Sequence, residues 1–542
     1  MESRKDGQKG ASEQSGRESG ARERKGIRLL KRGRRGLLHA VFSRAGLIAL
    51  FLLVQVALLY VGFGYLREYL PHYYVLSGLF STAMGLYLIN SHHEPNSKIT
   101  WLLVMALLPV FGGLLYLYTR SDLGHRMLRD RYARSVRESR DRLEQSVDTL
   151  VRVSDEAPEM LGLVRYLHRA GGFPVYDGTD ARYFPLGDAL FPALLEELER
   201  AEKFIFLEYF VVAEGEMWGE ILEVLARKAA QGVDVRLLYD GTNEFFTLPR
   251  DYPRRLEALG IRCKTFAPVT PFVSTHYNYR DHRKILVVDG KVAITGGVNL
   301  ADEYINRASR FGHWKDSALL LRGPAAESFT LMFLQMWSLD EEKTEDPRPY
   351  LGLAEPVEGA GGFVLPYADC PLDRERVGEW VYLDILDRAR RYVHIASPYL
   401  ILDQEMETAL RFAAERGVEV CLLLPGIPDK KLPYALAKTY YASLLSSGVK
   451  IYEYTPGFVH AKVFVADDRE AVVGTINLDY RSLYHHFECA AYLQDVACIR
   501  DIERDYRSTL ELCRRVTETT VKKEKRRVKL AGALMKVIAP LL

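Results

Sequence analysis

The chain has 542 residues, of which 48% are hydrophobic, and this length is sufficient for a membrane segment and two packed domains. Its formal net charge of +2 is nearly neutral for this size, so it lacks the broad basic character that a nucleic-acid-binding surface requires. The six cysteines form no CxxC pair, so the sequence suggests neither a cysteine-based zinc site nor a disulfide framework.

The N-terminal region divides into a polar part and an apolar part. Residues 1–44 are rich in Ser, Gly, Arg and Lys, which predicts a disordered basic arm. Residues 45–66 follow with no charge and, at a rise of about 1.5 Å per residue, can cross roughly 30 Å of hydrocarbon as a helix. A cleaved signal peptide is the rival interpretation, but no small-x-small cleavage site follows before Arg67.

Two further apolar stretches, 73–89 and 100–118, extend this transmembrane region over residues 45–119. The sequence therefore predicts a multi-pass membrane protein. Basic residues flank the region on both sides, which favours an even number of crossings. Under that rule 73–89 is an interfacial or re-entrant segment instead of a full span.

The sequence of the rest of the chain predicts a duplicated α/β protein. Residues 120–161 predict a basic linker or helix, and from there short β-branched and aromatic runs alternate with amphipathic helical stretches. This alternation predicts α/β domains with largely parallel sheets, and its recurrence predicts two copies, at 162–345 and 360–515. The last segment, 516–542, is basic and then apolar, which favours a cationic amphipathic helix lying on anionic lipid.

The duplication is clearest in a repeated motif, H-x-K-x4-D, followed by Gly and Asn at matching offsets. The two copies contain His282, Lys284, Asp289, Gly296 and Asn299, and His460, Lys462, Asp467, Gly474 and Asn477. In a strand, residues two apart share a face, so each His and Lys reach one pocket. A neutral imidazole can attack phosphorus while an ammonium and an amide stabilise the phosphate oxygens, and a second imidazole can protonate the leaving alcohol.

The doubled motif resembles the phospholipase D superfamily. Several other segments, among them PNSKITWLLVMALLPVFGGLLYLY, SPYLI and NLDYRSLYHHFE, resemble bacterial cardiolipin synthases. The resemblance implies two tandem phospholipase D-like domains related by a pseudo-two-fold, preceded by transmembrane helices. It also implies transfer of a phosphatidyl group from one phosphatidylglycerol to a second, giving cardiolipin and glycerol.

The resemblance further implies a catalytic group made of the His, Lys and Asp of both motifs: His282, Lys284, Asp289, His460, Lys462 and Asp467. His282 attacks to form a phosphatidyl-histidine, and His460 acts as acid and then as base. Each histidine is oriented by a carboxylate some thirty residues downstream of it. The implied phosphate ligands are Lys284, Lys462, Asn299 and Asn477, and the implied orienting carboxylates are Asp316 and Glu488. Two positions depart from the family pattern: His486 stands where Asn is frequent, and Lys315 where Arg is frequent.

Three alternatives stay open from the sequence. The enzyme could use another acceptor, such as water or another alcohol, it could be a superfamily nuclease, or the chain could be a lipid-binding scaffold. The membrane segments disfavour a nuclease, and two intact motifs disfavour a scaffold. No metal-ligand cluster or nucleotide-binding loop is visible, so we expect no metal and no cofactor. His313, His485 and His486 are interpreted as surface or supporting residues, and the sequence gives no prediction of oligomeric state.

Overall fold

The structure is a computed structural model that describes residues 60, 70–91, 94–120, 123–268, 279–373 and 375–541. The predicted basic arm 1–44 and nearly all of the predicted span 45–66 lie outside the described residues. The helices are α4 Leu70–Ile89, α5 Pro95–Leu107, α6 Pro109–Arg120, α7 Leu123–Ser139, α8 Val147–Glu156, α9 Leu161–Gly171, α10 Gly187–Arg200, α11 Glu216–Ala230, α12 Asn243–Phe246, α13 Tyr252–Glu257, α14 Ala326–Trp337, α15 Val377–Arg388, α16 Gln404–Glu415, α17 Lys431–Ala437, α18 Tyr441–Ser446, α19 Tyr480–Tyr484, α20 Ile499–Leu510, α21 Glu518–Lys522 and α22 Arg526–Ile538.

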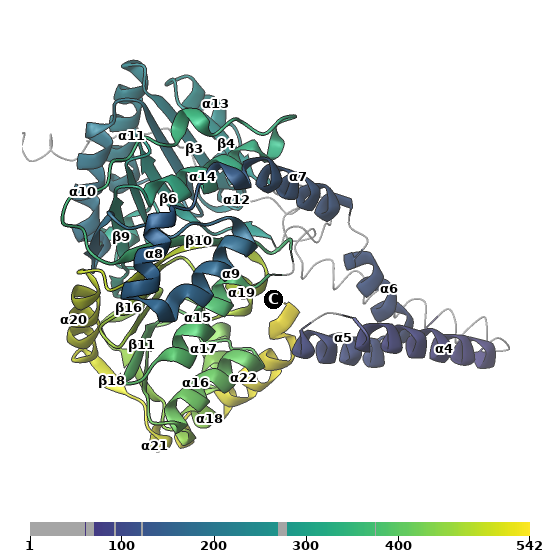
Figure 1. Ribbon diagram of the computed structural model, residues 1–542. Helices are drawn as coiled ribbons and strands as arrows, with labels where there is room; N and C mark the ends of the chain where they lie inside the picture. The colour runs from purple at the N-terminus through teal and green to yellow at the C-terminus, as the bar shows by residue number, and fades with distance from the viewer. Residues whose placement is uncertain are drawn as a thin grey trace, which may run out of the picture.

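Two large sheets form the centres of two α/β halves, which lie one above the other in Figure 1. The first half (teal) contains β1 Asp180–Phe184, β2 Phe204–Tyr209, β3 Asp234–Asp240, β4 Arg262–Phe266, β5 Arg280–Asp281, β6 Lys284–Val288, β7 Val292–Gly296, β8 His313–Lys315 and β9 Ala318–Arg322. The second (green to yellow) contains β10 Phe363–Asp369, β11 Tyr392–Ala396, β12 Glu419–Pro425, β13 Lys450–Tyr454, β14 Gly457–Val459, β15 Val463–Ala466, β16 Glu470–Gly474, β17 His486–Gln494 and β18 Cys513–Arg515.

The strand orders of the two sheets confirm the predicted duplication. The first sheet runs β1-β9-β7-β6-β2-β3-β4, and the second runs β10-β17-β16-β15-β11-β12-β13-β18. Position by position, each strand of the first sheet has a counterpart in the second. The motif strands β6, which begins at Lys284, and β15, which begins one residue after Lys462, occupy the same place, each next to the hairpin partner β7 or β16.

The prediction of largely parallel sheets was wrong. Along the two main strand orders of the described chain, the β2-β3-β4 and β11-β12-β13 sets are parallel, whereas the motif strands pair antiparallel with both of their neighbours. The cause is a tight turn within each motif, because each motif strand returns at once as a hairpin. A connection as short as these three residues can only join antiparallel strands.

The two halves share one continuous interior. Helix α14 of the first half is buried at every position except Glu327, and it packs on β10 of the second half as well as on β2, β6 and β7. Strand β7 also lies against β16 and β17. Helix α9, at the predicted start of the first domain, packs on β10 and α15. The chain therefore folds as two halves whose sheets face one another, and the site lies where they meet.

The N-terminal helices project from one side of this body (Figure 1). The predicted span 73–89 lies within α4, but the predicted span 100–118 is not one helix. It is divided into α5 and α6 at Leu108, whose φ of −133° and ψ of 71° are non-helical. The residue before a proline is driven out of the helical region, and Pro109 has no N–H to continue the ladder. Among the described helices, none combines the length and the apolar character that crossing a bilayer requires.

Candidate active site

Two short parallel pairings cross between the halves and position the two histidines. Strand β5 pairs with β17, and the backbone N–H of His282 then donates to the carbonyl of Phe487 at 3.0 Å. Strand β14 pairs with β8, and the N–H of His460 donates to the carbonyl of Lys315 at 2.7 Å. Each motif histidine is thus attached to a strand of the opposite half.

This crossing exchanges the two carboxylates. Nδ1 of His282 lies 2.9 and 3.0 Å from the two oxygens of Glu488, and Nδ1 of His460 lies 2.6 Å from Oδ2 of Asp316. The predicted pairing of each histidine with the carboxylate of its own copy was therefore wrong. Because a carboxylate accepts from Nδ1, we assign the hydrogen of each ring to Nδ1, which leaves the lone pair on Nε2. Nζ of Lys462 also lies 2.8 Å from Nδ1 of His460. Within the described chain, neither Nε2 makes a hydrogen bond.

Different residues support the two carboxylates. The hydroxyl of Thr475 donates to Oε2 of Glu488, and the backbone N–H of Ser317 donates to Oδ1 of Asp316 at 2.8 Å. Gly297 is the counterpart of Thr475 in the first motif, and a Cβ there would lie 1.9 Å from Oδ1 of Asp316. The first half therefore needs glycine where the second half uses a hydroxyl. The sequence analysis did not identify either position.

Both motif lysines are fully buried beside the histidines. Nζ of Lys284 donates to the carbonyl of His282 at 2.5 Å, and Lys462 donates in the same way to the carbonyl of His460. Burial lowers the pKa of Lys284 to about 8, with Glu488 opposing the shift. Burial likewise lowers the pKa of Lys462 to about 7, with Asp316 opposing. Two ammonium groups with such low pKa values constitute a site that gains from binding an anion.

The histidines respond to groups of both halves. Burial lowers the pKa of His282 well below its ordinary value, and the charges of Lys284 and Lys462 lower it further. Burial and Lys462 lower the pKa of His460 to about 4, while the carboxylate of Asp316 opposes that shift. Since a lysine of each half acts on the histidine of the other, the two motifs form one electrostatic site.

Asp289 and Asp467 bind backbone groups away from the two histidines, and their place in the catalytic group stays a prediction. The carboxylate of Asp289 accepts the backbone N–H groups of Glu202, Lys203 and Phe204 at 2.7–2.8 Å. Asp467 accepts the N–H groups of Arg390, Arg391 and Tyr392 at 2.7–2.9 Å. Both aspartates are at the start of the hairpin turn, at the opposite end of the motif strand from the histidine. They tie that turn to the beginning of the neighbouring strand.

The two asparagines differ in their contacts. Asn299 accepts the N–H of Val211 at 2.9 Å and donates to the hydroxyl of Tyr304 at 2.7 Å, so its amide is engaged with protein groups. Oδ1 of Asn477 is buried without a hydrogen-bond partner among the described residues. Tyr304 packs edge-on against His460 with ring centroids 5.4 Å apart. Binding of phosphate by the two asparagines remains a prediction.

An additional histidine lies against the site. The ring of His486 packs on that of His282 with centroids 5.2 Å apart, and Phe210 covers the other side of His282 at 4.9 Å. His486 is 7% exposed, so it is not a surface residue. His313 is half-buried and contacts Tyr454 at 2.9 Å away from this centre. Alternation along HHFE, which places residues 486 and 488 on one face of β17, was the available signal for His486.

Buried charges lie behind His282. Glu208 is completely buried 3.9 Å from Arg283, and Arg283 donates to the carbonyl of Glu488 at 3.2 Å. Burial and the neighbouring carboxylate of Asp281 raise the pKa of Glu208 well above its ordinary value. Glu208 therefore supports the segment that contains His282 and does not face a ligand. Asp240 supports the same segment, because its carboxylate accepts the N–H of Asp281 at 3.1 Å.

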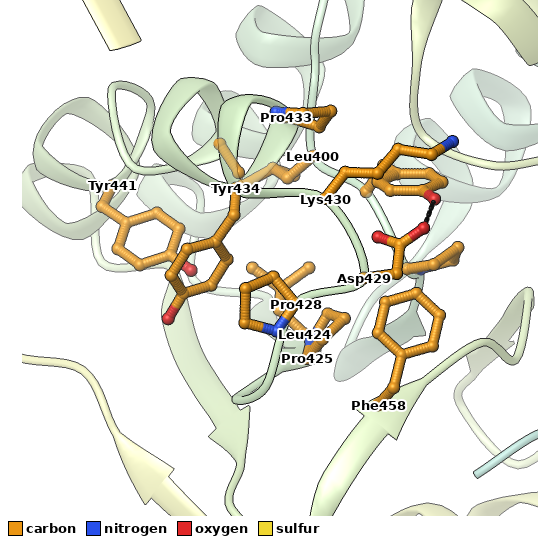
Figure 2. A pocket seen from close by; sticks show the side chains of 13 residues that line it. Leu400, Leu424, Pro425, Pro428, Asp429, Lys430, Pro433, Tyr434, Tyr441 and Phe458 are labelled. Carbon is orange, nitrogen blue, oxygen red and sulfur yellow. Dashed lines mark hydrogen bonds between the residues drawn. The ribbon is translucent and has the colours of Figure 1, made fainter. Parts of the chain in front are cut away.

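An apolar pocket opens beside the second motif (Figure 2). Leu424, Pro425 and Pro428 line it together with Phe458, whose ring centroid lies 5.9 Å from that of His460. Asp429 accepts a hydrogen bond from Tyr399 at its edge. Such a lining suits an apolar or amphiphilic substrate group more than a nucleotide.

A duplicated α/β fold with two carboxylate-bound histidines and two buried lysines defines a phosphodiester-processing enzyme of the phospholipase D class. The comparisons agree: residues 194–337 and 382–510 match the family described as "Cardiolipin synthase, PLD-like domain", and residues 80–120 match "Phospholipase_D-nuclease N-terminal". The chain therefore belongs to the cardiolipin synthase family of the phospholipase D superfamily.

Individual relatives cover nearly the whole chain. A cardiolipin synthase of Alkalihalophilus pseudofirmus is 32% identical, with 92% of this chain and 100% of the relative aligned. One of Geobacillus kaustophilus is 34% identical over 86% and 94% of the two chains. An uncharacterized protein of Streptococcus mutans is 56% identical over 84% and 99%. The crystal structure of a phosphatidylserine synthase from Haemophilus influenzae shares the fold, with a TM-score of 0.54, 15% identity, and 67% and 95% coverage.

Proposed function

We propose that this protein is a cardiolipin synthase that transfers a phosphatidyl group between two molecules of phosphatidylglycerol. The observation that carries the proposal is the crossed arrangement, in which each imidazole is held at Nδ1 by a carboxylate of the other half. Two such rings beside two buried lysines supply a nucleophile, a proton donor and an anion site in one place. The names of the relatives supply the lipid substrates.

In the first half-reaction, Nε2 of His282 attacks the phosphorus of phosphatidylglycerol. The bond from phosphorus to the glycerol oxygen breaks, and His460 gives that oxygen a proton. Lys284 and Lys462 stabilise the charge on the non-bridging oxygens, and we propose that the amide N–H groups of Asn477 assist them. Free glycerol leaves, and a phosphatidyl-histidine remains on the enzyme.

In the second half-reaction, the acceptor is the primary hydroxyl of another phosphatidylglycerol. His460, now neutral, removes its proton, and the alkoxide oxygen attacks the phosphorus. The bond from phosphorus to Nε2 of His282 breaks, which releases cardiolipin and restores both rings. Two successive displacements at one phosphorus need one group that attacks and one that moves the proton, which the two histidines provide.

The surroundings of the two rings favour His282 as the nucleophile. Glu488 lies at the Nδ1 of His282, but burial and the cationic charges of Lys284 and Lys462 lower the pKa of this ring and favour its neutral, attacking form. Asp316 favours the protonated form of His460 and so suits it to act as the acid. Binding of the anionic substrate next to Lys462 removes part of the repulsion that opposes this protonation.

We also propose that the protein is attached to a bacterial cell membrane. The apolar run 45–66 is the proposed anchor. The exposed apolar residues of α5 follow helical spacing, at Ile99, Leu103 and Leu107, and those of α22 do the same, at Leu530 and Leu534. These helices adjoin one another, because the hydroxyl of residue 100 donates to the carbonyl of residue 537 at 2.6 Å. Together with the basic residues of α22, they form a surface suited to anionic lipid.

The test of activity uses membranes containing the full chain and phosphatidylglycerol labelled in its terminal glycerol. We expect cardiolipin and labelled free glycerol, and no cardiolipin from the His282→Ala variant. Phosphatidic acid in place of cardiolipin would identify a hydrolase, and a different diester in the presence of added alcohol would identify another acceptor. Ordinary cardiolipin formation by His282→Ala would contradict the mechanism.

The test of membrane attachment uses a cysteine introduced at Arg131, in α7. Its labelling by a membrane-impermeant thiol reagent in intact cells, compared with opened cells, reports which side of the membrane carries the catalytic halves. Recovery of the full chain in the soluble fraction after cell lysis would refute attachment.

A further inference from the structure

The nucleophilic histidine also belongs to a cluster of possible metal ligands. His282, His486 and Glu488 each offer one ligand atom, and these three atoms lie within 4.8 Å of one another. The three residues are 6%, 7% and 0% exposed, so the cluster is a buried one. Two imidazole nitrogens and one carboxylate oxygen are a donor set that suits Zn²⁺ and Cu²⁺.

The separations within the cluster are close to those of a coordinated ion. Nδ1 of His486 lies 3.5 Å from Oε1 of Glu488, and Nδ1 of His282 lies 2.9 Å from the same oxygen. With metal-ligand bonds of about 2.0–2.1 Å, neighbouring ligands of a tetrahedral zinc ion are about 3.4 Å apart. Small side-chain movements would therefore bring the three atoms around one ion and leave a fourth position open.

His486 supplies an independent observation. Its two ring nitrogens are buried, and neither makes a hydrogen bond within the described part of the chain. A buried polar group without a hydrogen bond is destabilising, so this ring is expected to gain from any ligand that occupies one nitrogen. It packs against His282 with ring centroids 5.2 Å apart.

The other half of the molecule lacks the equivalent group. Two residues before Asp316 stands Trp314, which packs on His460 at 5.3 Å as His486 packs on His282. An indole offers no lone pair for a metal ion. The cluster is thus confined to the second half's β17 and to the histidine that we assign as the nucleophile.

We infer that His282, His486 and Glu488 form an inhibitory site for Zn²⁺ or Cu²⁺. An ion on Nδ1 of His282 forces the ring hydrogen to Nε2, which then has no lone pair with which to attack phosphorus. An ion on Nε2 occupies the attacking atom itself. In both cases the ring stays neutral overall, no bond of the lipid changes, and the transfer stops before the covalent step. The inference rests on the proposed function, because it concerns the nucleophile of that reaction.

A second cluster of possible ligands, Glu379, Asp403 and Glu405, carries no such inference. Arg376 lies 2.9 Å from Glu379, and Tyr484 donates to Asp403, so these carboxylates already have cationic and hydrogen-bonding partners. Their all-oxygen donor set suits hard ions such as Ca²⁺ or Mg²⁺. The two clusters can therefore be distinguished by the nitrogen ligands of a bound copper ion.

The experiment uses the full chain in lipid nanodiscs, purified through a tag that contains no histidine. One equivalent of Cu²⁺ is added, and electron paramagnetic resonance reports whether imidazole nitrogens bind it. In parallel, Zn²⁺ is titrated into the transfer assay with the wild type, the His486→Asn and His486→Gln variants, and a matched control, His485→Asn. Within each variant, activity is expressed relative to the same preparation treated with chelator, so a change in basal rate does not affect the comparison.

We expect an imidazole-nitrogen signal in the wild type and in His485→Asn that is lost in both variants of residue 486. We also expect the zinc concentration for half-inhibition to rise at least tenfold in those variants, because loss of even an outer-shell partner of a metal typically costs 10–100-fold in affinity. Equal zinc sensitivity of the wild type and both variants, or a copper signal that does not depend on residue 486, would overturn the inference. Because the copper spectrum needs no turnover, it separates failure of this site from failure of the proposed activity.

Discussion

Glu488 and Asp316 determine what each histidine can do. Glu488 is the carboxylate at Nδ1 of His282, and Asp316 is the carboxylate at Nδ1 of His460, each from the opposite half. The crossed arrangement predicts different defects for the two carboxylates. Glu488→Gln should behave like a His282 variant and prevent the covalent step. Asp316→Asn should behave like a His460 variant and slow both proton transfers. Removing the carboxylate of a comparable triad lowers kcat about 10⁴-fold, and we expect losses of roughly 10³-fold or more.

The measurement is rapid quenching with labelled phosphatidylglycerol, followed by isolation of acid-labile phosphate on histidine. Asp316→Asn should retain measurable labelling of His282, whereas Glu488→Gln should show none. Reversal of these two outcomes would indicate that the histidines exchange roles.

Gly297 gives a steric prediction at the same centre. In Gly297→Ala the new methyl group would meet Oδ1 of Asp316, so the carboxylate must move away from His460. A displacement of about 1 Å at a catalytic group can cost 10²-fold in rate, and we expect a loss of that order without loss of fold. Gly162→Ala, at a position with open space around it, is the matched control and should leave the transfer rate unchanged. An active Gly297→Ala enzyme would show that Asp316 is not needed in its observed position.

The lysines make the reaction dependent on pH on the alkaline side. The pKa of Lys462 is about 7 and that of Lys284 about 8, so both ammonium groups are charged below these values and lose their charge as the pH rises through them. The value of kcat/KM should therefore fall between about pH 7 and pH 9, while kcat should fall at higher pH because bound phosphate stabilises the charged lysines. The arginine of Lys462→Arg stays charged throughout, so kcat/KM of this variant should begin to fall at a higher pH than in the wild type, whatever its maximum rate. A fall of kcat/KM at the same pH in this variant would exclude Lys462 as its cause.

At the residue scale, the sequence predicted the histidines, the lysines and the two carboxylates, because the doubled motif has little chance of arising twice with the same trailing residues. It could not predict the exchange of Glu488 and Asp316, since spacing along the chain does not say which half a side chain faces. The sequence also indicated neither Thr475 nor Gly297. Their roles depend on the acidic side chain that each one faces, the longer Glu488 for Thr475 and the shorter Asp316 for Gly297.

At the scale of elements, the hairpin that follows each motif strand is the feature that the sequence analysis misread. Asp289 and Gly290 have φ values of 53° and 68°, and Asp467 and Asp468 have 55° and 61°. Positive φ at both central residues is the type I′ turn, for which Asp-Gly between alternating hydrophobic residues is a strong signal. Recognising that signal would have predicted antiparallel motif strands. It would also have assigned the aspartate of the motif to the turn.

The aspartates of these turns should therefore affect stability. Asp289→Ala leaves three backbone N–H groups without their acceptor and places alanine at a positive φ. We expect a loss of about 1–3 kcal/mol and a Tm lowered by several degrees in a thermal unfolding experiment. Asp289→Asn tolerates the same φ and keeps one acceptor, so it should lose less. Activity per folded molecule should be nearly normal in both variants. A stable but inactive Asp289→Ala would place this residue in the catalytic group.

At the scale of the whole molecule, the two halves are joined by buried polar contacts as well as by the shared core. Nζ of Lys315, in β8, lies 2.7 Å from Asp505 in α20 of the other half, and Tyr183 donates to the same carboxylate at 2.7 Å. Lys315 is largely buried. Replacing it by Met removes the cation that pairs with the carboxylate of Asp505. We expect Lys315→Met to cost roughly 3 kcal/mol, and the double variant with Asp505→Asn to cost less than the sum of the two single changes. Additive losses in urea unfolding would show that the pair is not coupled.

Reciprocal exchange of carboxylates also has a consequence during synthesis. A chain that has left the ribosome only as far as α14 already contains His282, Lys284 and Asp316, but Glu488 has not been translated. Its first imidazole has no acidic partner, and Asp316 has no ring to hold. We therefore expect that an unfinished or prematurely terminated polypeptide cannot attack lipids, and that phosphodiester chemistry begins only when the last strands have folded against the first half.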